Sequence, residues 1–125
     1  MVNGKRQAKL VADMTAGIHR IIADAPVALG GSDQGPGPHE IFEASLVACT
    51  IITLQMYADR HQWNLDSAEV TVKIDKEGAE SHLTREVKLI GDLSDEQRDK
   101  LFEIADKCPI HKLMSSHISI STVRH

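Results

Sequence analysis

The chain has 125 residues, a formal net charge of −4, 42% apolar residues and 26% charged residues, as in an ordinary globular domain. The acidic balance and the 3% aromatic content provide neither a basic stripe for phosphates nor a stacking platform for bases, which argues against a nucleic-acid partner. The first seven residues lack the apolar core of a signal peptide, and two cysteines make no disulfide framework. We therefore expect a single domain over residues 1–125, located in the cytoplasm.

The N-terminal part predicts a hairpin followed by an irregular loop. Residues 6–14 alternate apolar and polar side chains, a turn follows around Gly17, and residues 18–23 are a second β-prone run. Residues 24–38 carry four glycines and three prolines, too many for a regular element. Such a loop is either a plain connector or a place where the backbone approaches a ligand closely.

The stretch from Pro38 to Gln62 has no internal breaker and predicts a helix about 36 Å long. Its middle, residues 44–54, carries apolar or small side chains on every face, which is typical of a buried helix. The apolar run is interrupted by polar residues and is too short and too polar for a membrane span. Cys49 lies near the centre of this helix.

The second half predicts a hairpin, two helices and a last strand. Residues 68–76 and 84–90 alternate on either side of a polar turn, as in a hairpin with one wet face. Ser94 and Gln97 form a capping-box pattern, so a helix is expected over residues 95–107, and Pro109 can begin a short further helix. Residues 117–123 alternate again. The order ββ–α–ββ–αα–β predicts an α+β domain in which antiparallel sheet packs on the long helix.

The two cysteines are the residues that could carry chemistry. Cys49 taken alone is consistent with plain packing, because free cysteines are among the most buried residues. Cys108 precedes Pro109, where the amides of a new helix, together with His111 and Lys112, could lower the pKa of a thiol and stabilise the thiolate. The segment CPIHK is therefore a candidate reactive-thiol site, although a core cysteine beside a helix break explains it equally well.

A zinc site is the competing use of the same residues. Two residues separate Cys108 from His111, and His117 follows. Structural zinc takes four ligands, commonly in two close pairs, and Cys49 has no cysteine or histidine within four residues. The sequence predicts neither a bound metal nor a cofactor.

Three segments together resemble the OsmC/Ohr family of thiol-dependent peroxidases, in particular its short OsmC-like branch: LGGSDQGPGPHEIFEASLVACT, TLQMYADR and KCPIHK. The resemblance implies an intertwined homodimer in which Cys49 is the peroxidatic thiol and Cys108 the resolving thiol. Cys49 would be oxidised to a sulfenic acid and would then form a disulfide with Cys108. An external dithiol or a lipoylated protein would reduce that disulfide.

The chain departs from the family where the thiol is activated. The peroxidase branch has a glutamate ten residues before the helix cysteine, paired with an arginine, whereas His39 occupies that position here. His39 could supply positive charge but cannot clamp an arginine as a carboxylate would. Arg20 and Arg6, from the predicted N-terminal hairpin, are the candidates for the arginine.

The sequence thus predicts a cysteine-based peroxidase in oxidative-stress defence, acting on organic hydroperoxides, with hydrogen peroxide as a further candidate substrate. Its predicted site residues are Cys49, Cys108, Arg20 and His39. The alternative is a non-catalytic or redox-responsive protein of the same fold that binds a small hydrophobic ligand.

Overall fold

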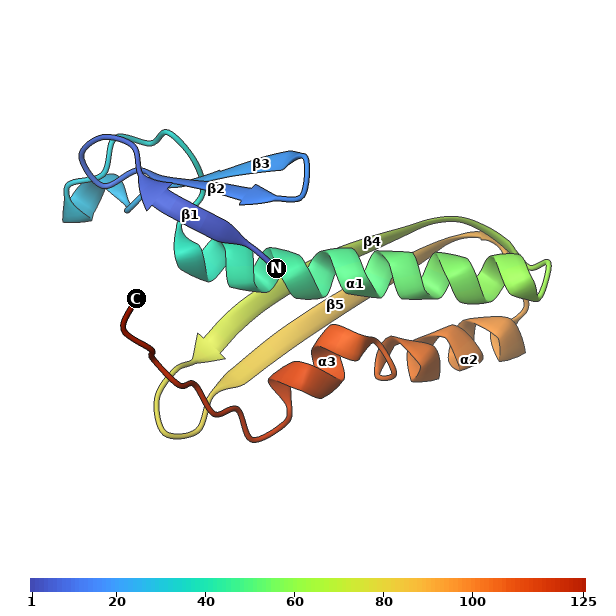
Figure 1. The fold of residues 1–125 in the computed structure, drawn as a ribbon. Coiled ribbons are helices and arrows are strands. Elements are labelled where there is room, and N and C mark those ends of the chain that lie inside the picture. The colour runs from blue at the N-terminus through green and yellow to red at the C-terminus, as the bar shows by residue number, and fades with distance from the viewer. The chain divides into compact units, whose positions relative to one another are not determined.

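The computed structural model describes residues 1–125, and the chain divides into two compact units, residues 1–44 and 45–125. Three strands and a 3-10 turn are followed by a long helix, two strands and two helices (Figure 1). The fold is α+β with two small antiparallel sheets, which confirms the predicted class. That residues 1–125 act as a single domain stays a prediction.

The first unit contains a three-stranded antiparallel sheet, made of β1 (Asn3–Arg6), β2 (Ala12–Ala16) and β3 (His19–Ala23) in that order. The predicted hairpin is present as β2 and β3, joined at Gly17, whose φ is 62°. The predicted single strand over residues 6–14 is wrong. The chain reverses within it, at Lys9 with a φ of 49°, so that its two ends belong to two strands that pair with each other.

The loop after β3 is irregular, as predicted, apart from the 3-10 turn η1 (Val27–Leu29). Its glycines let the backbone pack closely against itself. A Cβ atom on Gly31 would lie 1.6 Å from the carbonyl oxygen of Ala25, and one on Gly35 would lie 2.5 Å from that of Ile22. These two positions therefore exclude a side chain because of contacts within the first unit.

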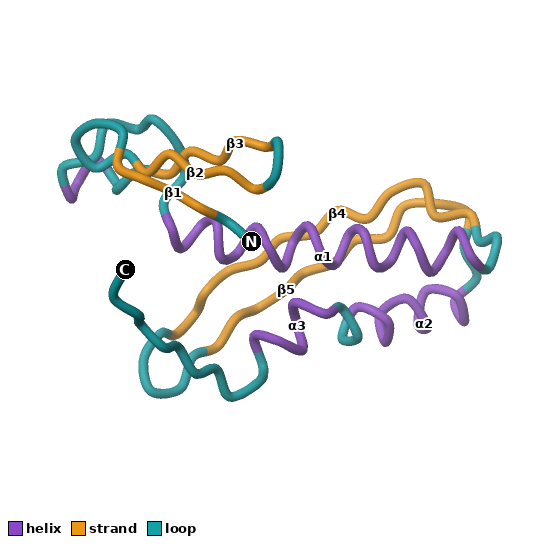
Figure 2. Tube along the Cα trace, in the orientation of Figure 1, coloured by secondary structure: helices purple, strands orange, loops and turns teal.

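The second unit is built on a long antiparallel hairpin of β4 (Asn64–Lys76) and β5 (His82–Asp92). The helix α1 (Pro38–Arg60) contributes its residues from Ser45 onward to this unit. After the hairpin come α2 (Asp95–Ala105) and α3 (Pro109–Met114). Figure 2 shows the two strands running side by side, with α2 and α3 following one another along them.

Two hydrophobic clusters hold the second unit together. The larger joins α1, both strands of the hairpin and α2, and contains Leu54, Ala58, Leu65, Ala68, Leu89, Leu101, Ile104 and Ala105. The smaller contains Leu46, Val72 and Cys108, with Cys49 packed against it. Within this one chain α1 buries a single stripe, whose residues lie four apart at Leu46, Thr50, Leu54 and Ala58. The expectation of a helix buried on every face is therefore not met by one copy of the chain.

In the C-terminal part of the chain, the predictions from local sequence signals are correct for the helices and wrong for the last strand. The capping box of α2 is present, because Gln97 N–H donates to Ser94 Oγ at 3.2 Å and Ser94 N–H donates to Gln97 Oε1 at 3.0 Å. The short helix begins at Pro109, as predicted. The predicted strand over residues 117–123 is wrong: this segment pairs with no other strand, and Ile118 and Ile120 are exposed. Alternation alone does not make a strand, because a strand needs a neighbour to accept and donate its backbone hydrogen bonds.

By length and composition α1 could cross a membrane, with a mean hydropathy of 1.5 over its most apolar window, contrary to the expectation from its polar interruptions. One such helix is weak evidence, because the core helix of a globular domain passes the same test. Leu54 and Ala58 are fully buried against the hairpin and α2. The structure has no clear membrane-protein character.

Candidate active site

The two thiols lie together in the second unit. Cys49 is on α1 and is partly exposed, whereas Cys108, between α2 and α3, is fully buried. Both are free, and Cys49 packs against the cluster that contains Cys108. The two cysteines are 59 positions apart in the sequence, and they meet because α2 packs on the same core as α1. The structure thus brings together the two cysteines selected from the sequence.

The environment makes the two thiols unequal. Burial by itself raises the pKa of Cys49, but several groups outweigh it and hold that pKa below its ordinary value. These groups are the thiol of Cys108, the N–H of Ile110, the hydroxyl of Thr53 and the positive charge of Arg85. The Thr53 oxygen lies 3.8 Å from the Cys49 sulfur. Cys49 is therefore the thiol that ionises first.

The pKa of Cys108 moves the other way. Burial is the largest cause and raises this pKa, and donation to Cys49 raises it further. The N–H groups of His111 and Ile110 lower the pKa of Cys108, but by less than the other two causes raise it. The expectation that the surroundings of Cys108 would lower the pKa of its thiol is therefore wrong in direction. The amides at the start of α3 do face sulfur, but one of them, the N–H of Ile110, also serves Cys49.

Arg85 on β5 is the charged residue beside the thiols that the sequence interpretation missed. Its side chain is only 11% exposed. One guanidinium nitrogen donates to Thr50 Oγ1 at 3.2 Å, and another donates to Asp106 Oδ1 at 2.9 Å. A signal for it was present, because Arg85 stands in phase with Leu83, Val87 and Leu89, which are the inward residues of the strand. A charge on an apolar face requires a partner.

A pocket of about 270 Å³ opens next to this group. It is lined by Leu46, Leu83, Arg85, Asp106, His111 and Met114. Its three apolar residues also belong to, or pack against, the cluster that contains Cys108 and contacts Cys49. The pocket therefore offers an apolar wall and a polar rim beside the thiols.

The other predicted site residues lie in the first unit. Arg20, on β3, makes a two-point ion pair with Asp13, with nitrogen–oxygen distances of 2.9 and 3.0 Å. Arg6 donates to the carbonyl oxygen of Lys9 at 3.3 Å. His39 is exposed in the first turn of α1. The activating roles of Arg20 and His39 stay predictions.

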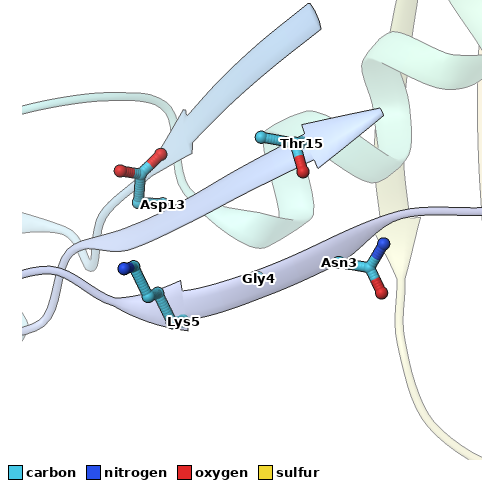
Figure 3. Close-up of a pocket in the computed structure, with 5 residues that line it drawn as sticks. All are labelled: Asn3, Gly4, Lys5, Asp13 and Thr15. Atoms are coloured by element: carbon cyan, nitrogen blue, oxygen red, sulfur yellow. The ribbon is translucent and has the colours of Figure 1, made fainter. Parts of the chain in front are cut away.

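Two further observations concern binding. No group of three or more His, Cys, Asp or Glu side chains gathers where it could hold a metal ion. A second hollow of about 270 Å³ lies on the first sheet and is lined by Asn3, Gly4, Lys5, Asp13 and Thr15 (Figure 3). It contains no thiol, and its only carboxylate is already paired with Arg20.

Two free cysteines, one partly exposed with a lowered pKa and one buried, thus pack together on an α+β fold. The family model described as OsmC-like protein matches residues 31–123 of the chain. The chain therefore belongs to the OsmC-like family, as its sequence segments suggested. A comparison with curated proteins finds no match.

Solved structures share the fold at low identity. An OsmC-like protein from Mycoplasma pneumoniae is 14% identical with a TM-score of 0.76, over 91% of this chain and 85% of that chain. An organic hydroperoxide resistance protein from Legionella pneumophila is 19% identical with a TM-score of 0.64, over 92% and 88%. One from Elizabethkingia anophelis is 20% identical with a TM-score of 0.65, also over 92% and 88%. At these identities the likeness shows the fold alone.

Proposed function

We propose that the protein is a thiol peroxidase that reduces organic hydroperoxides, with hydrogen peroxide as a further candidate substrate, in oxidative-stress defence. The observation that carries the proposal is the packing of Cys49, which is partly exposed and has a lowered pKa, against the cluster that contains the buried Cys108. Two solved structures of the same fold are named organic hydroperoxide resistance proteins, which is consistent with this chemistry.

In the first step the Cys49 thiolate attacks one oxygen of the hydroperoxide, and the O–O bond breaks. The sulfur becomes a sulfenic acid, and the other oxygen leaves as an alcohol after taking a proton. In the second step the sulfur of Cys108 attacks the Cys49 sulfenic acid, so that a disulfide forms and water leaves. An external dithiol then reduces the disulfide by exchange. No bound cofactor enters this cycle.

The pocket beside the thiols supports an organic substrate. Leu46, Leu83 and Met114 give it an apolar wall, which suits the carbon chain of an organic hydroperoxide better than it suits water or hydrogen peroxide. Arg85 and His111 on its rim could hold the oxygen end of the substrate. The free energy of binding would come mainly from burying the apolar part.

Kinetics with three proteins test the proposal. Consumption of cumene hydroperoxide with dithiol reductant is followed for the wild type, Cys49→Ser and Cys108→Ser. We expect Cys49→Ser to fall to the uncatalysed rate. After one equivalent of hydroperoxide, the wild type should lose two hydrogens in mass, whereas Cys108→Ser should gain one oxygen that a sulfenic-acid reagent traps.

Equal rates for the wild type and Cys49→Ser would refute the peroxidase. The alternative, a protein that binds a small hydrophobic ligand, would then be favoured if both thiols also stay unreactive toward peroxide. The same apolar pocket would serve as the ligand site in that case.

The partners form part of the proposal. We infer a homodimer from the family resemblance, and apolar side chains on α1 agree with it, because Ile51, Ile52 and Met56 are exposed in the single chain. They line a groove of about 460 Å³ between α1 and β4. The proposed reductant is a dithiol, with a lipoylated protein as one candidate, and the proposed location is the cytoplasm.

A further inference from the structure

Arg85 is a charge that the second unit holds in place. It lies on the inward face of β5, and both of its side-chain hydrogen bonds join separate elements. Thr50, on α1, also donates its own hydroxyl proton to the carbonyl oxygen of Leu46 at 2.7 Å, so its oxygen is free to accept from Arg85. Thr50 directly follows Cys49 in the chain. The guanidinium is thereby fixed beside the residue that carries the acidic thiol.

The counterion of Arg85 is exposed, whereas the guanidinium itself is largely buried. Asp106, which ends α2, is 72% exposed and meets the guanidinium from the solvent side at 2.9 Å. Water screens an exposed carboxylate, so it neutralises only part of the guanidinium charge. His111 Nδ1 lies 3.9 Å from the same Asp106 oxygen. Cys108 and Arg85 are thus the titratable and charged groups that act on Cys49, and Asp106 and His111 are joined to Arg85 through the shared carboxylate.

We propose that Arg85 is a positioning residue for this site, which holds a fixed positive charge that keeps Cys49 as a thiolate, and that Asp106 sets how much of that charge Cys49 receives. This inference rests on the proposed peroxidase function. It assigns the activating arginine to β5, whereas the candidates taken from the family resemblance lie in the N-terminal hairpin. The direction of the Cys49 pKa, to which the charge of Arg85 contributes after burial and the hydrogen bonds, agrees with it.

Two substitutions should act in opposite directions. Arg85→Met keeps the apolar stem but removes the charge, so it should raise the pH midpoint of Cys49 ionisation. Asp106→Asn removes the counterion but keeps the guanidinium, so it should lower that midpoint. Each unit of change alters the thiolate fraction below the midpoint by about tenfold. Arg85→Lys keeps a charge without the two-point geometry and should fall between the wild type and Arg85→Met.

The readout is the rate at which iodoacetamide alkylates Cys49 between pH 5 and 9, followed by peptide mass in the full-length protein. Lys88→Met is the matched control, because Lys88 lies on the same strand, is 73% exposed and should leave the profile unchanged. If the Arg85–Asp106 ion pair were purely structural, Arg85→Met and Asp106→Asn would shift the pH midpoint of Cys49 in the same direction, because both substitutions break the pair. Same-sign shifts, or no shift in either variant, would overturn the inference.

This measurement uses no hydroperoxide, so the inference and the proposed function can fail separately. A wild type that consumes hydroperoxide but shows no opposite shifts refutes the role of Arg85 alone. Opposite shifts in a protein that does not consume hydroperoxide refute the peroxidase and leave Arg85 as the residue that makes Cys49 acidic.

Discussion

Asp24 organises the glycine-rich loop of the first unit. Its side chain is 2% exposed, and its two oxygens accept from the N–H groups of Ala25, Ser32 and Gln34 at 2.8, 3.0 and 3.2 Å. The hydroxyl of Ser32 adds a fourth bond at 3.1 Å. Burial by itself raises the pKa of Asp24, but these hydrogen bonds outweigh it and hold the pKa below its ordinary value. An irregular loop is thus given a defined conformation by one carboxylate.

We expect Asp24→Asn to lower the melting temperature at pH 7 by several degrees, because an amide replaces one acceptor oxygen with a donor that faces other donors. The carboxylate is less basic in the folded state, so its contribution is present above the ordinary pKa of an aspartate and is lost as the pH falls through the lowered pKa. The difference between variant and wild type should therefore shrink in acid. Thermal unfolding at pH 7 and pH 3 measures it.

The matched control is Asp33→Asn in the same loop. Asp33 is exposed and has a φ of 56°, a conformation that asparagine also adopts readily. Its melting temperature should stay close to that of the wild type. If both variants lowered the melting temperature equally, Asp24 would stabilise the loop only as any charged residue there would.

Single residues also show what the sequence could and could not predict about the site. Cys49 and Cys108 were selected because of their type and their sequence segments, and the structure brings them together. Arg85 was missed because it was counted among the charges of a strand with one wet face, although its place in the alternation puts it on the dry face. The contact of Arg85 with α1 and α2 depends on packing between distant segments, which no local pattern encodes.

At the scale of elements, the prediction was best for helices whose start is encoded by residues within the helix or next to it. The helix α2 follows from its own capping box, and α3 follows from Pro109. The first and last predicted strands failed because alternation does not reveal where a chain reverses or whether a partner strand exists. A strand is stabilised by hydrogen bonds to a neighbour that can lie anywhere in the sequence.

The cap of α2 gives a test at this scale. Ser94→Ala removes the acceptor for Gln97 N–H and should lower the free energy of unfolding by about 1 kcal/mol. Urea unfolding followed by circular dichroism measures the change. Ser115→Ala, at an exposed serine after α3, is the control and should change stability little. No difference between the two variants would show that the capping box is not needed once α2 is packed.

At the scale of the whole molecule, one chain leaves apolar surface uncovered. Ile52 and Met56 on α1 are 57% and 49% exposed, although the sequence of the helix predicted burial on every face. A large exposed apolar surface costs free energy in water and is typical of an interface. In the proposed homodimer a second copy of the chain would cover these side chains, which no local pattern in the sequence encodes.

We expect the wild type to be a dimer in light scattering at micromolar concentration and Ile52→Glu to shift it to monomer, because a carboxylate cannot be buried unpaired in an apolar interface. Thr71→Glu is the matched control, since it adds the same charge at an exposed position of β4. A monomeric wild type would contradict the proposed homodimer, and equal effects of both variants would contradict the choice of face.

The unequal burial of the two sulfurs has a consequence for the return to the reduced state. In the proposed cycle a reductant thiolate reaches only Cys49, because Cys108 is covered. Attack on that sulfur must expel Cys108, and a thiol of high pKa is a poor leaving group. Because burial raises the pKa of Cys108, this exchange would be slower than one that expels an ordinary, exposed thiol. The disulfide form would then persist for longer after the peroxide is gone.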